Sequence, residues 1–135
     1  MADRGKLIFE ANKNVLEAGD TGALAEFFLD GYSAHAGGRV HRGYAFISGF
    51  VTQLRNAIPD LAVQDVAVLS ESGDYVTWQR TLSGTHTGKL IDVPPSGQPV
   101  EWREMVVSRF QAGRIAEEWV VSELWGELLS KAKQP

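Results

Sequence analysis

The chain has 135 residues, which is the size of one domain, with 44% apolar residues, 22% charged residues and a net charge of −4. We therefore expect one globular domain over residues 1–135. The negative charge is dispersed, which argues against nucleic acid or an anionic membrane as the main partner. No segment approaches the roughly 20 apolar residues that span a bilayer, and residues 1–6 are not an apolar signal region, so the expected location is cytoplasmic. Without cysteine, disulfides, thiol nucleophiles and thiolate metal sites are excluded.

The first half of the chain has helical periodicity. A first helix is predicted from an apolar stripe that ends near Gly19, and Asp20 or Thr21 can cap a short second helix. Residues 30–39 are predicted to form a loop. A third helix is expected over residues 44–57, with Pro59 ending it. The stripes of the three helices consist of Leu7, Ile8, Ala11, Val15 and Leu16, then Leu24, Phe27 and Phe28, then Phe46, Ile47, Phe50, Leu54 and Ile58.

After Pro59 the apolar period becomes two, which is typical of strands. Strands are predicted over residues 63–70, 75–87, 100–110 and 114–123. Residues 72–74 form a predicted turn, residues 94–97 a loop, and Ala112-Gly113 a hairpin turn. Residues 124–131 are expected to form a last helical turn or to extend the sheet edge.

Helices followed by long antiparallel strands predict an α+β domain with segregated layers. A bent sheet wrapped around helices leaves a cone-shaped cavity, which is a natural site for a small molecule. The aromatic residues available to line it are Tyr32, Phe46, Phe50, Trp78, Trp102 and Trp119.

One face of the strand over residues 75–87 combines apolar side chains with Arg80 and His86. A buried arginine needs a carboxylate partner, and Glu117 and Glu104 are the candidates. The pair is either a structural ion pair inside the sheet or part of the polar end of the cavity. In both cases it would help to shape that end of the cavity.

Several kinds of chemistry lack a supporting motif. The histidines His35, His41 and His86 do not have the spacing of a metal site, so no metal is expected. No serine lies in a nucleophile elbow, and no glycine motif for phosphate is present. Proton transfer in a mostly apolar pocket remains, and we expect no cofactor.

Glu123 is the leading candidate for that proton transfer. On a strand beginning at residue 114, it shares a face with Glu117 and Trp119, and a carboxylate beside a tryptophan on a buried face should have a raised pKa. A carboxyl group of this kind is a good general acid or base near neutral pH. The alternative is that Glu123 lies in solvent at a strand end.

The chain resembles the SnoaL-like (ester cyclase) family of polyketide cyclases, which have the cone-shaped NTF2-like fold. The resemblance rests on the order and spacing of short motifs over most of the chain. These motifs are Ile58-Pro59-Asp60-Leu61, Gly73-Asp74-Tyr75-Val76, Gly84-Thr85-His86-Thr87-Gly88, Pro94-Pro95-Ser96-Gly97 and the run from Arg109 to Trp119.

The resemblance implies ring closure by intramolecular aldol condensation, without metal or organic cofactor. It implies that the acidic residue four positions after the strand tryptophan, here Glu123, is the general acid/base, and that His35 and His86 line the pocket. The family usually has aspartate there, so this side chain is one methylene longer. Under this hypothesis Tyr32, Arg80 and Glu117 contact the substrate, and the apolar walls are Phe50, Trp78, Trp102, Met105 and Trp119.

Two alternatives use the same cavity. One is a related hydroxylase, dehydratase or hydrolase acting on another hydrophobic molecule, with Glu123 activating water. The other is a binding protein that performs no chemistry. A homodimer through the outer sheet face is expected, since small domains of this superfamily often pair in that way.

Overall fold

The computed structural model describes residues 3–132, in which helical segments come before most of the sheet. The segments are α1 (Arg4–Ala11), the π-helix η1 (Asn12–Glu17), the short 3-10 helix η2 (Thr21–Ala23), α2 (Leu24–Phe27), α3 (Gly43–Ala57) and α4 (Leu124–Ala132). Asp3 caps α1 by accepting the Lys6 backbone N–H at 3.0 Å. The first predicted helix is confirmed, and after it the chain reverses at Gly19, where φ is +75°. Residues 124–131, left open between helix and strand, belong to α4.

Six strands form one sheet within residues 3–132, in the order β2-β1-β6-β5-β4-β3. The strands are β1 (Phe28–Ala36), β2 (Arg39–Arg42), β3 (Ala62–Ser72), β4 (Tyr75–Thr85), β5 (Pro99–Gln111) and β6 (Arg114–Ser122). Neighbouring strands are antiparallel except β1 and β6, which are parallel.

The prediction of a loop over residues 30–39 is wrong, because this segment contains most of β1 and begins β2. Gly37 and Gly38, with φ of +61° and +77°, make the turn between the two strands. The backbone of β1 pairs with β2 on one side and, on the other, with β6, a strand about eighty residues later in the chain, as in the pairing of His35 with Trp119. Local sequence carries no signal of such a distant parallel pairing.

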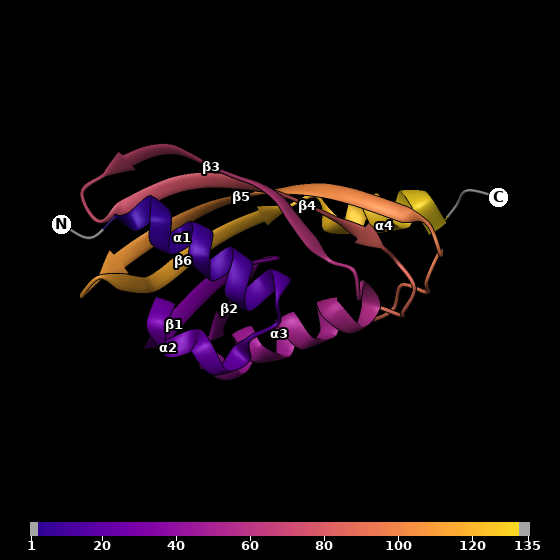
Figure 1. Cartoon of the computed structure of the whole chain (residues 1–135), viewed down its shortest axis with the longest axis horizontal. Helices are drawn as coiled ribbons and strands as arrows, with labels where there is room; N and C mark the ends of the chain where they lie inside the picture. The colour runs from indigo at the N-terminus through magenta and orange to yellow at the C-terminus, as the bar shows by residue number, and fades with distance from the viewer. Residues whose placement is uncertain (1–2, 133–135) are drawn as a thin grey trace.

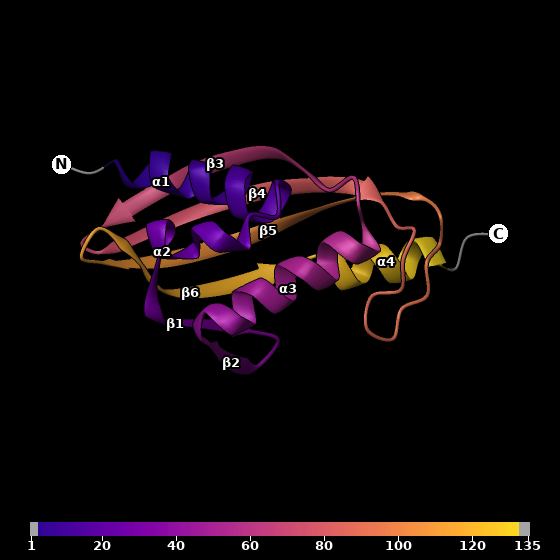
Figure 2. The same cartoon turned by 60° about the horizontal axis from the view of Figure 1, so that its bottom comes forward.

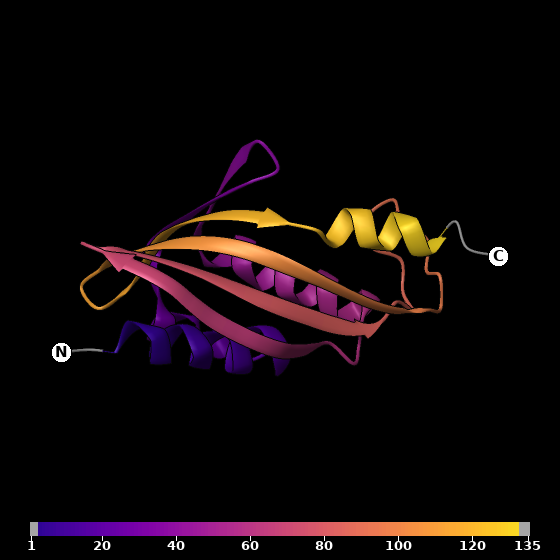
Figure 3. The ribbon, with the colours of Figure 1, turned by 90° about the horizontal axis from the view of Figure 1, so that it is seen from above.

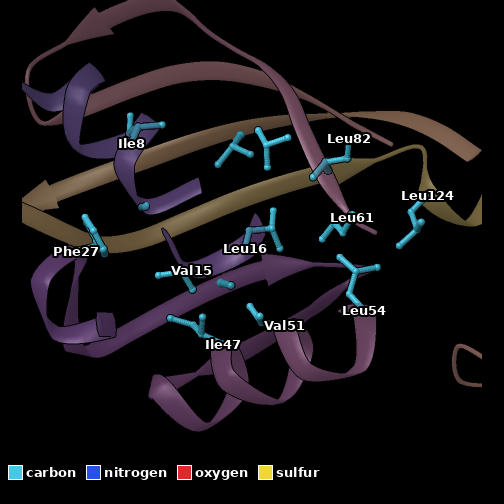
Figure 4. Close-up of a cluster of buried hydrophobic side chains, with 14 of the residues drawn as sticks. Ile8, Val15, Leu16, Phe27, Ile47, Val51, Leu54, Leu61, Leu82 and Leu124 are labelled. Atoms are coloured by element: carbon cyan, nitrogen blue, oxygen red, sulfur yellow. The ribbon is translucent and has the colours of Figure 1, made fainter. Parts of the chain in front are cut away.

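The helices α1, α2 and α3 lie on the concave side of a curved, unclosed sheet, and Figure 2 shows them in front of the strands. In the view from above, the strands pass in front of α3, and the β1–β2 hairpin projects from the sheet (Figure 3). Helix α4 follows β6 and lies against β5 (Figure 1). The core fills the space between the layers, and its side chains come from α1, η1, α2, α3, the start of α4 and the facing strands (Figure 4).

A β-bulge at Ala116 decides which residues of β6 face the concave side. Phe110 of β5 pairs with Ile115, but the next residue, Arg109, pairs with Glu117, so Ala116 is an extra residue. One added residue moves every later side chain to the opposite face. The β6 side chains that line the cavity therefore include Ile115, Glu118, Val120 and Ser122. The predicted inward face of Glu117, Trp119 and Glu123 is wrong.

Candidate functional site

A cavity of about 440 Å³ lies between the helices and the concave face of the sheet. Its walls come from α1, η1, β1, α3, β4, β5, β6 and the start of α4, and most of its lining is apolar. Figure 4 shows several of the lining side chains, including Ile8, Val15 and Ile47. The polar or titratable side chains in the lining are Asn12, Tyr32, Trp78, Arg80, Glu104, Glu118, Ser122 and Trp125. These residues can orient a ligand within otherwise apolar walls.

One polar group of the cavity is a buried ion pair between β4 and β5. Arg80 Nε and Nη2 lie 2.8 and 2.6 Å from Glu104 Oε1, while Arg80 Nη1 donates to Asn12 Oδ1 at 2.9 Å. Burial alone would raise the pKa of Glu104, but the Arg80 charge and hydrogen bonds from Ser122, Arg80 and Trp102 hold it below its ordinary value. Of the two predicted partners of Arg80, the structure selects Glu104.

The second polar group is centred on Glu118, which is only 7% exposed. The Tyr32 hydroxyl donates to Glu118 Oε1 at 2.7 Å, and the Ser108 hydroxyl donates to Oε2 at 2.5 Å. Burial raises the pKa of Glu118, and the negative charge of Glu104 adds to this; Ser108, Tyr32 and Arg80 offset only part of the rise. A carboxyl group with these properties can hold and release a proton close to a ligand.

The importance of Glu118 was missed by sequence reasoning. Regular alternation from residue 114 assigns Glu117, not Glu118, to the face of Ile115, and nothing in the local sequence marks the bulge at Ala116. The inward alternation of β5, which includes Glu104 and Ser108, was the available indication that polar partners face the cavity.

The structure places Glu123 outside the cavity lining, at the junction of β6 and α4. Its side chain is 59% exposed, and Oε1 accepts the side-chain and backbone N–H groups of Arg103 at 3.3 and 3.2 Å. The Glu123 backbone carbonyl accepts the Glu127 N–H in the first turn of α4. The expected buried environment is therefore wrong, and the alternative of a solvent-exposed carboxylate describes the geometry.

His35, Glu117, Trp119 and Met105 lie on the outer side of the sheet and do not line the cavity. His35 Nε2 lies 2.7 Å from Glu117 Oε2, and Arg109 Nε donates to Glu117 at 3.0 Å. These hydrogen bonds, that of His35 first, lower the pKa of Glu117 despite partial burial. The His35 and Trp119 rings stack at 5.0 Å with 4° between their planes. The bulge at Ala116 accounts for the β6 residues, while Met105 takes an outward position in β5 and is 39% exposed.

His86 lies just beyond β4 and is fully buried, but it is not part of the cavity lining. Among residues 3–132, neither of its ring nitrogens meets a hydrogen-bond partner at ordinary geometry. Burial lowers the pKa of His86, and the backbone of Gly88 offsets part of this effect. The two ring nitrogens are thus packed away from the expected pocket.

The remaining predicted ligand contacts fall in two groups. Tyr32, Phe50, Trp78 and Arg80 line the cavity, and their contact with a substrate stays a prediction. Trp102 is buried beside the cavity, where its Nε1 donates to Glu104 Oε2 at 3.3 Å.

Two further properties concern the described residues as a whole. Residues 3–132 bring together no group of three or more acidic or histidine side chains that could hold a metal ion. No helix in this part of the chain is long and apolar enough to cross a membrane.

Solved structures with the same fold cover almost the whole chain. A structure from Acidithiobacillus ferrooxidans, provisionally assigned as a polyketide cyclase, has a TM-score of 0.82 at 20% identity and covers 100% of this chain and 99% of its own. For IdmH from Streptomyces antibioticus, also a provisional polyketide cyclase, the TM-score is 0.73 at 26% identity, with coverage of 96% and 97%. AclR from Streptomyces galilaeus, provisionally a hydroxylase, has a TM-score of 0.80 at 23% identity and coverage of 98% and 82%.

These likenesses confirm the predicted α+β cone of NTF2-like type. Comparison with curated proteins gives no match. The family model of the SnoaL-like polyketide cyclases matches residues 6–128. This chain therefore belongs to the SnoaL-like polyketide cyclase family.

Proposed function

We propose that this protein is a cofactor-independent enzyme of the polyketide cyclase type, which closes a ring by intramolecular aldol condensation. The observation that carries the proposal is a buried carboxyl group, Glu118, in the wall of a largely apolar cavity, with its pKa raised by burial. Family membership supports the reaction class.

The proposed reaction needs one group that moves a proton from carbon to oxygen. The carboxylate form of Glu118 takes a proton from a carbon activated by adjacent carbonyl groups, and the C–H electron pair forms an enolate. The enolate carbon then bonds to a second carbonyl carbon of the same molecule. The π electrons of that second carbonyl group move to its oxygen. Protonated Glu118 returns the proton to that oxygen, so the ring forms without loss of any atom.

Glu118 suits this role better than the other carboxylates near the sheet. Glu104 is held in an ion pair with Arg80, and its lowered pKa makes it a weak base. Glu123, to which the resemblance assigns the role, lies outside the cavity and is paired with Arg103. We therefore assign the general acid/base to Glu118.

The cavity supports a hydrophobic substrate. Phe50, Phe46 and Trp78 supply flat aromatic walls, and the charges of Arg80 and Glu104 compensate each other. A volume of about 440 Å³ lies within the usual range of small-molecule sites.

Paired variants test the assignment. Wild type, Glu118→Gln and Glu123→Gln are incubated with the methyl ester of a linear polyketide precursor, and cyclised product is separated by chromatography and quantified. Glu118→Gln should lower kcat about 100-fold or more, because general acid/base groups contribute that much, while Glu123→Gln keeps the wild-type rate. Equal turnover by wild type and Glu118→Gln would remove Glu118 from the mechanism.

The same incubation distinguishes the alternative functions. An oxygenated, dehydrated or hydrolysed product would identify a related enzyme of this fold, and tight binding without a product would identify a binding protein.

We further propose that the protein is a homodimer that pairs through the outer sheet face. Met105 and Tyr75 are 39% and 44% exposed on this face, and Trp119 is partly exposed beside Tyr75. Burying such side chains would stabilise a pair. Light scattering should give twice the chain mass for wild type and the monomer mass for Met105→Glu; a wild-type monomer at high concentration would refute the proposal.

A further inference from the structure

We propose that Tyr32 is the residue that touches the ligand oxygen, as the last member of a one-way hydrogen-bond chain from Trp78 through Ser108 and Glu118. This inference deepens the proposed function, because both place the ligand in the same cavity. It adds Tyr32 as a second catalytic residue beside Glu118 and assigns a positioning role to Ser108 and Trp78.

The chain links three side chains that line the cavity, Trp78, Glu118 and Tyr32, through the enclosed hydroxyl group of Ser108. Trp78 Nε1 donates to Ser108 Oγ at 2.9 Å, Ser108 Oγ donates to Glu118 Oε2 at 2.5 Å, and Tyr32 Oη lies 2.7 Å from Glu118 Oε1. Ser108 has no exposed surface and does not line the cavity, whereas Glu118 and Tyr32 do. A continuous path therefore connects a fully enclosed hydroxyl group to a phenol at the cavity wall.

The direction of this chain follows from the chemistry of its members. An indole N–H can only donate, so Ser108 must accept from Trp78 and point its own hydrogen at Glu118 Oε2. When Glu118 is neutral, its proton belongs on Oε1, where it is donated to Tyr32 Oη. The hydroxyl hydrogen of Tyr32 is then free to turn toward the cavity. All hydrogen bonds of the chain point in the same direction, so each one strengthens the next.

The protonation state of Glu118 therefore controls the donor. Burial raises the pKa of Glu118, which favours the neutral form that releases the Tyr32 hydrogen toward a ligand. When Glu118 is ionised, Tyr32 donates to it instead, and burial together with the Glu118 charge raises the pKa of Tyr32 well above its ordinary value. Tyr32 can therefore donate a hydrogen bond to a ligand oxygen only when Glu118 is neutral.

The surroundings select a neutral carbonyl compound. Arg80 and Glu104 satisfy each other, so the polar end of the cavity has no uncompensated charge when Glu118 is neutral. A ketone oxygen accepts a hydrogen bond without bringing a charge into an apolar space, which a carboxylate ligand would do at a high cost. A flat aromatic ring attached to the ketone matches the aromatic walls formed by Phe46 and Phe50, whose rings stack at 6.2 Å.

The return of the proton along this chain leaves the number of O–H bonds unchanged. The ligand alkoxide oxygen takes the Tyr32 hydrogen as Tyr32 Oη takes the hydrogen of Glu118, so one O–H bond forms for each that breaks. Glu118 ends as a carboxylate that accepts from Ser108 and Tyr32 and lies within the field of Arg80.

Infrared spectroscopy and binding measurements test the chain without turnover. The probe is 2-acetonaphthone labelled with ¹³C at its carbonyl, and 2-ethylnaphthalene, which lacks the oxygen, is the matched ligand. The full-length wild type should bind the ketone and shift its carbonyl stretch to lower frequency than in an apolar solvent. In Tyr32→Phe the stretch should return toward the apolar value and ketone affinity fall about three- to tenfold, the value of one neutral hydrogen bond.

Further variants separate the chain from a general effect on folding. Ser108→Ala removes one polarising donor but leaves Tyr32, so it should move the carbonyl stretch only part of the way. Tyr75→Phe removes a phenol oxygen from the outer face and should change neither measurement. Affinity for 2-ethylnaphthalene should be the same in all four proteins, which shows that the cavity is intact.

The results that would overturn the proposal are specific. An unchanged carbonyl frequency in Tyr32→Phe, or failure of wild type to bind the ketone, would reject Tyr32 as the donor to a ligand oxygen. If turnover still depends on Glu118 in that case, the proposed function stands and only this inference fails. If the carbonyl frequency shifts as expected but Glu118→Gln turns over normally, the proposed function fails and the donor chain remains.

Discussion

The Arg80–Glu104 pair gives the most direct test of how polar groups are held in this cavity. In Glu104→Gln the carboxylate is replaced by an amide of nearly the same shape. Four donor groups converge on the two carboxylate oxygens: Nε and Nη2 of Arg80 on Oε1, and the Ser122 hydroxyl and Trp102 indole on Oε2. A glutamine keeps one acceptor oxygen and turns an NH₂ group toward two of these donors. The Arg80 charge, in a side chain only 15% exposed, loses its partner.

The expected loss of stability follows from leaving the Arg80 charge without its partner. Removing one member of a buried ion pair costs about 3–5 kcal/mol, because the remaining charge stays desolvated without compensation. For a domain of this length that corresponds to a fall in Tm of about 10–20 °C. Urea titration followed by tryptophan fluorescence gives the free energy of unfolding, and an unchanged m-value would show that the loss is in the folded state.

Two controls make the result interpretable. Glu123→Gln breaks the exposed pair with Arg103 and should change the free energy of unfolding far less. The double variant Arg80→Met/Glu104→Leu removes both charges and should be more stable than Glu104→Gln alone, because no unpaired charge stays buried. A loss below about 1 kcal/mol in Glu104→Gln would mean that water reaches the pair, and the account of an enclosed polar end would be wrong.

The other predictions concern pH and packing. Burial lowers the folded-state pKa of His86 below its unfolded value, so the unfolded state binds more protons. Wild type should therefore lose stability as pH falls from about 7 to 5. In His86→Met, urea titrations at each pH should show a smaller fall in the free energy of unfolding. The pKa of Glu118 is raised, so its contribution to stability is present at acid pH and is lost as pH rises through the folded-state value. Glu118→Gln should therefore gain stability relative to wild type as pH rises, and a constant difference across pH would contradict a buried carboxyl group. A Cβ at Gly88 would lie 2.6 Å from the Asn56 carbonyl oxygen. Gly88→Ala should therefore lower the free energy of unfolding by about 1–3 kcal/mol. An unchanged Tm would show that this loop moves aside easily.

Much of the candidate site follows from local alternation. Trp78, Arg80 and Leu82 were expected on one face of their strand, and the structure buries all or most of each side chain on the concave side. The need of a buried arginine for a carboxylate led to Glu104 as one of two candidates. These predictions succeed because side-chain direction in a regular strand depends only on parity.

The parts that sequence reasoning missed depend on contacts between distant segments. β1 is a strand because it pairs with β2 and, in parallel, with the distant β6, and no residue between 30 and 39 reveals that second partner. Glu118 faces the cavity because one residue, Ala116, has no partner on β5. Parity applied from residue 114 therefore placed Glu117 and Glu123 inside, and both are outside.

The amino-acid sequence by itself determined the helices of the first half but not its strands β1 and β2, and it determined the β-rich second half, the family and the presence of ionisable groups on otherwise apolar strands. Tertiary structure alone decided which carboxyl group is enclosed and which is left in solvent. The physical reason is that enclosure depends on the register between strands, and a single bulged residue reverses it. Because burial raises the pKa of a carboxyl group, the same bulge determines that Glu118, and not Glu123, has the properties of a proton-transfer group.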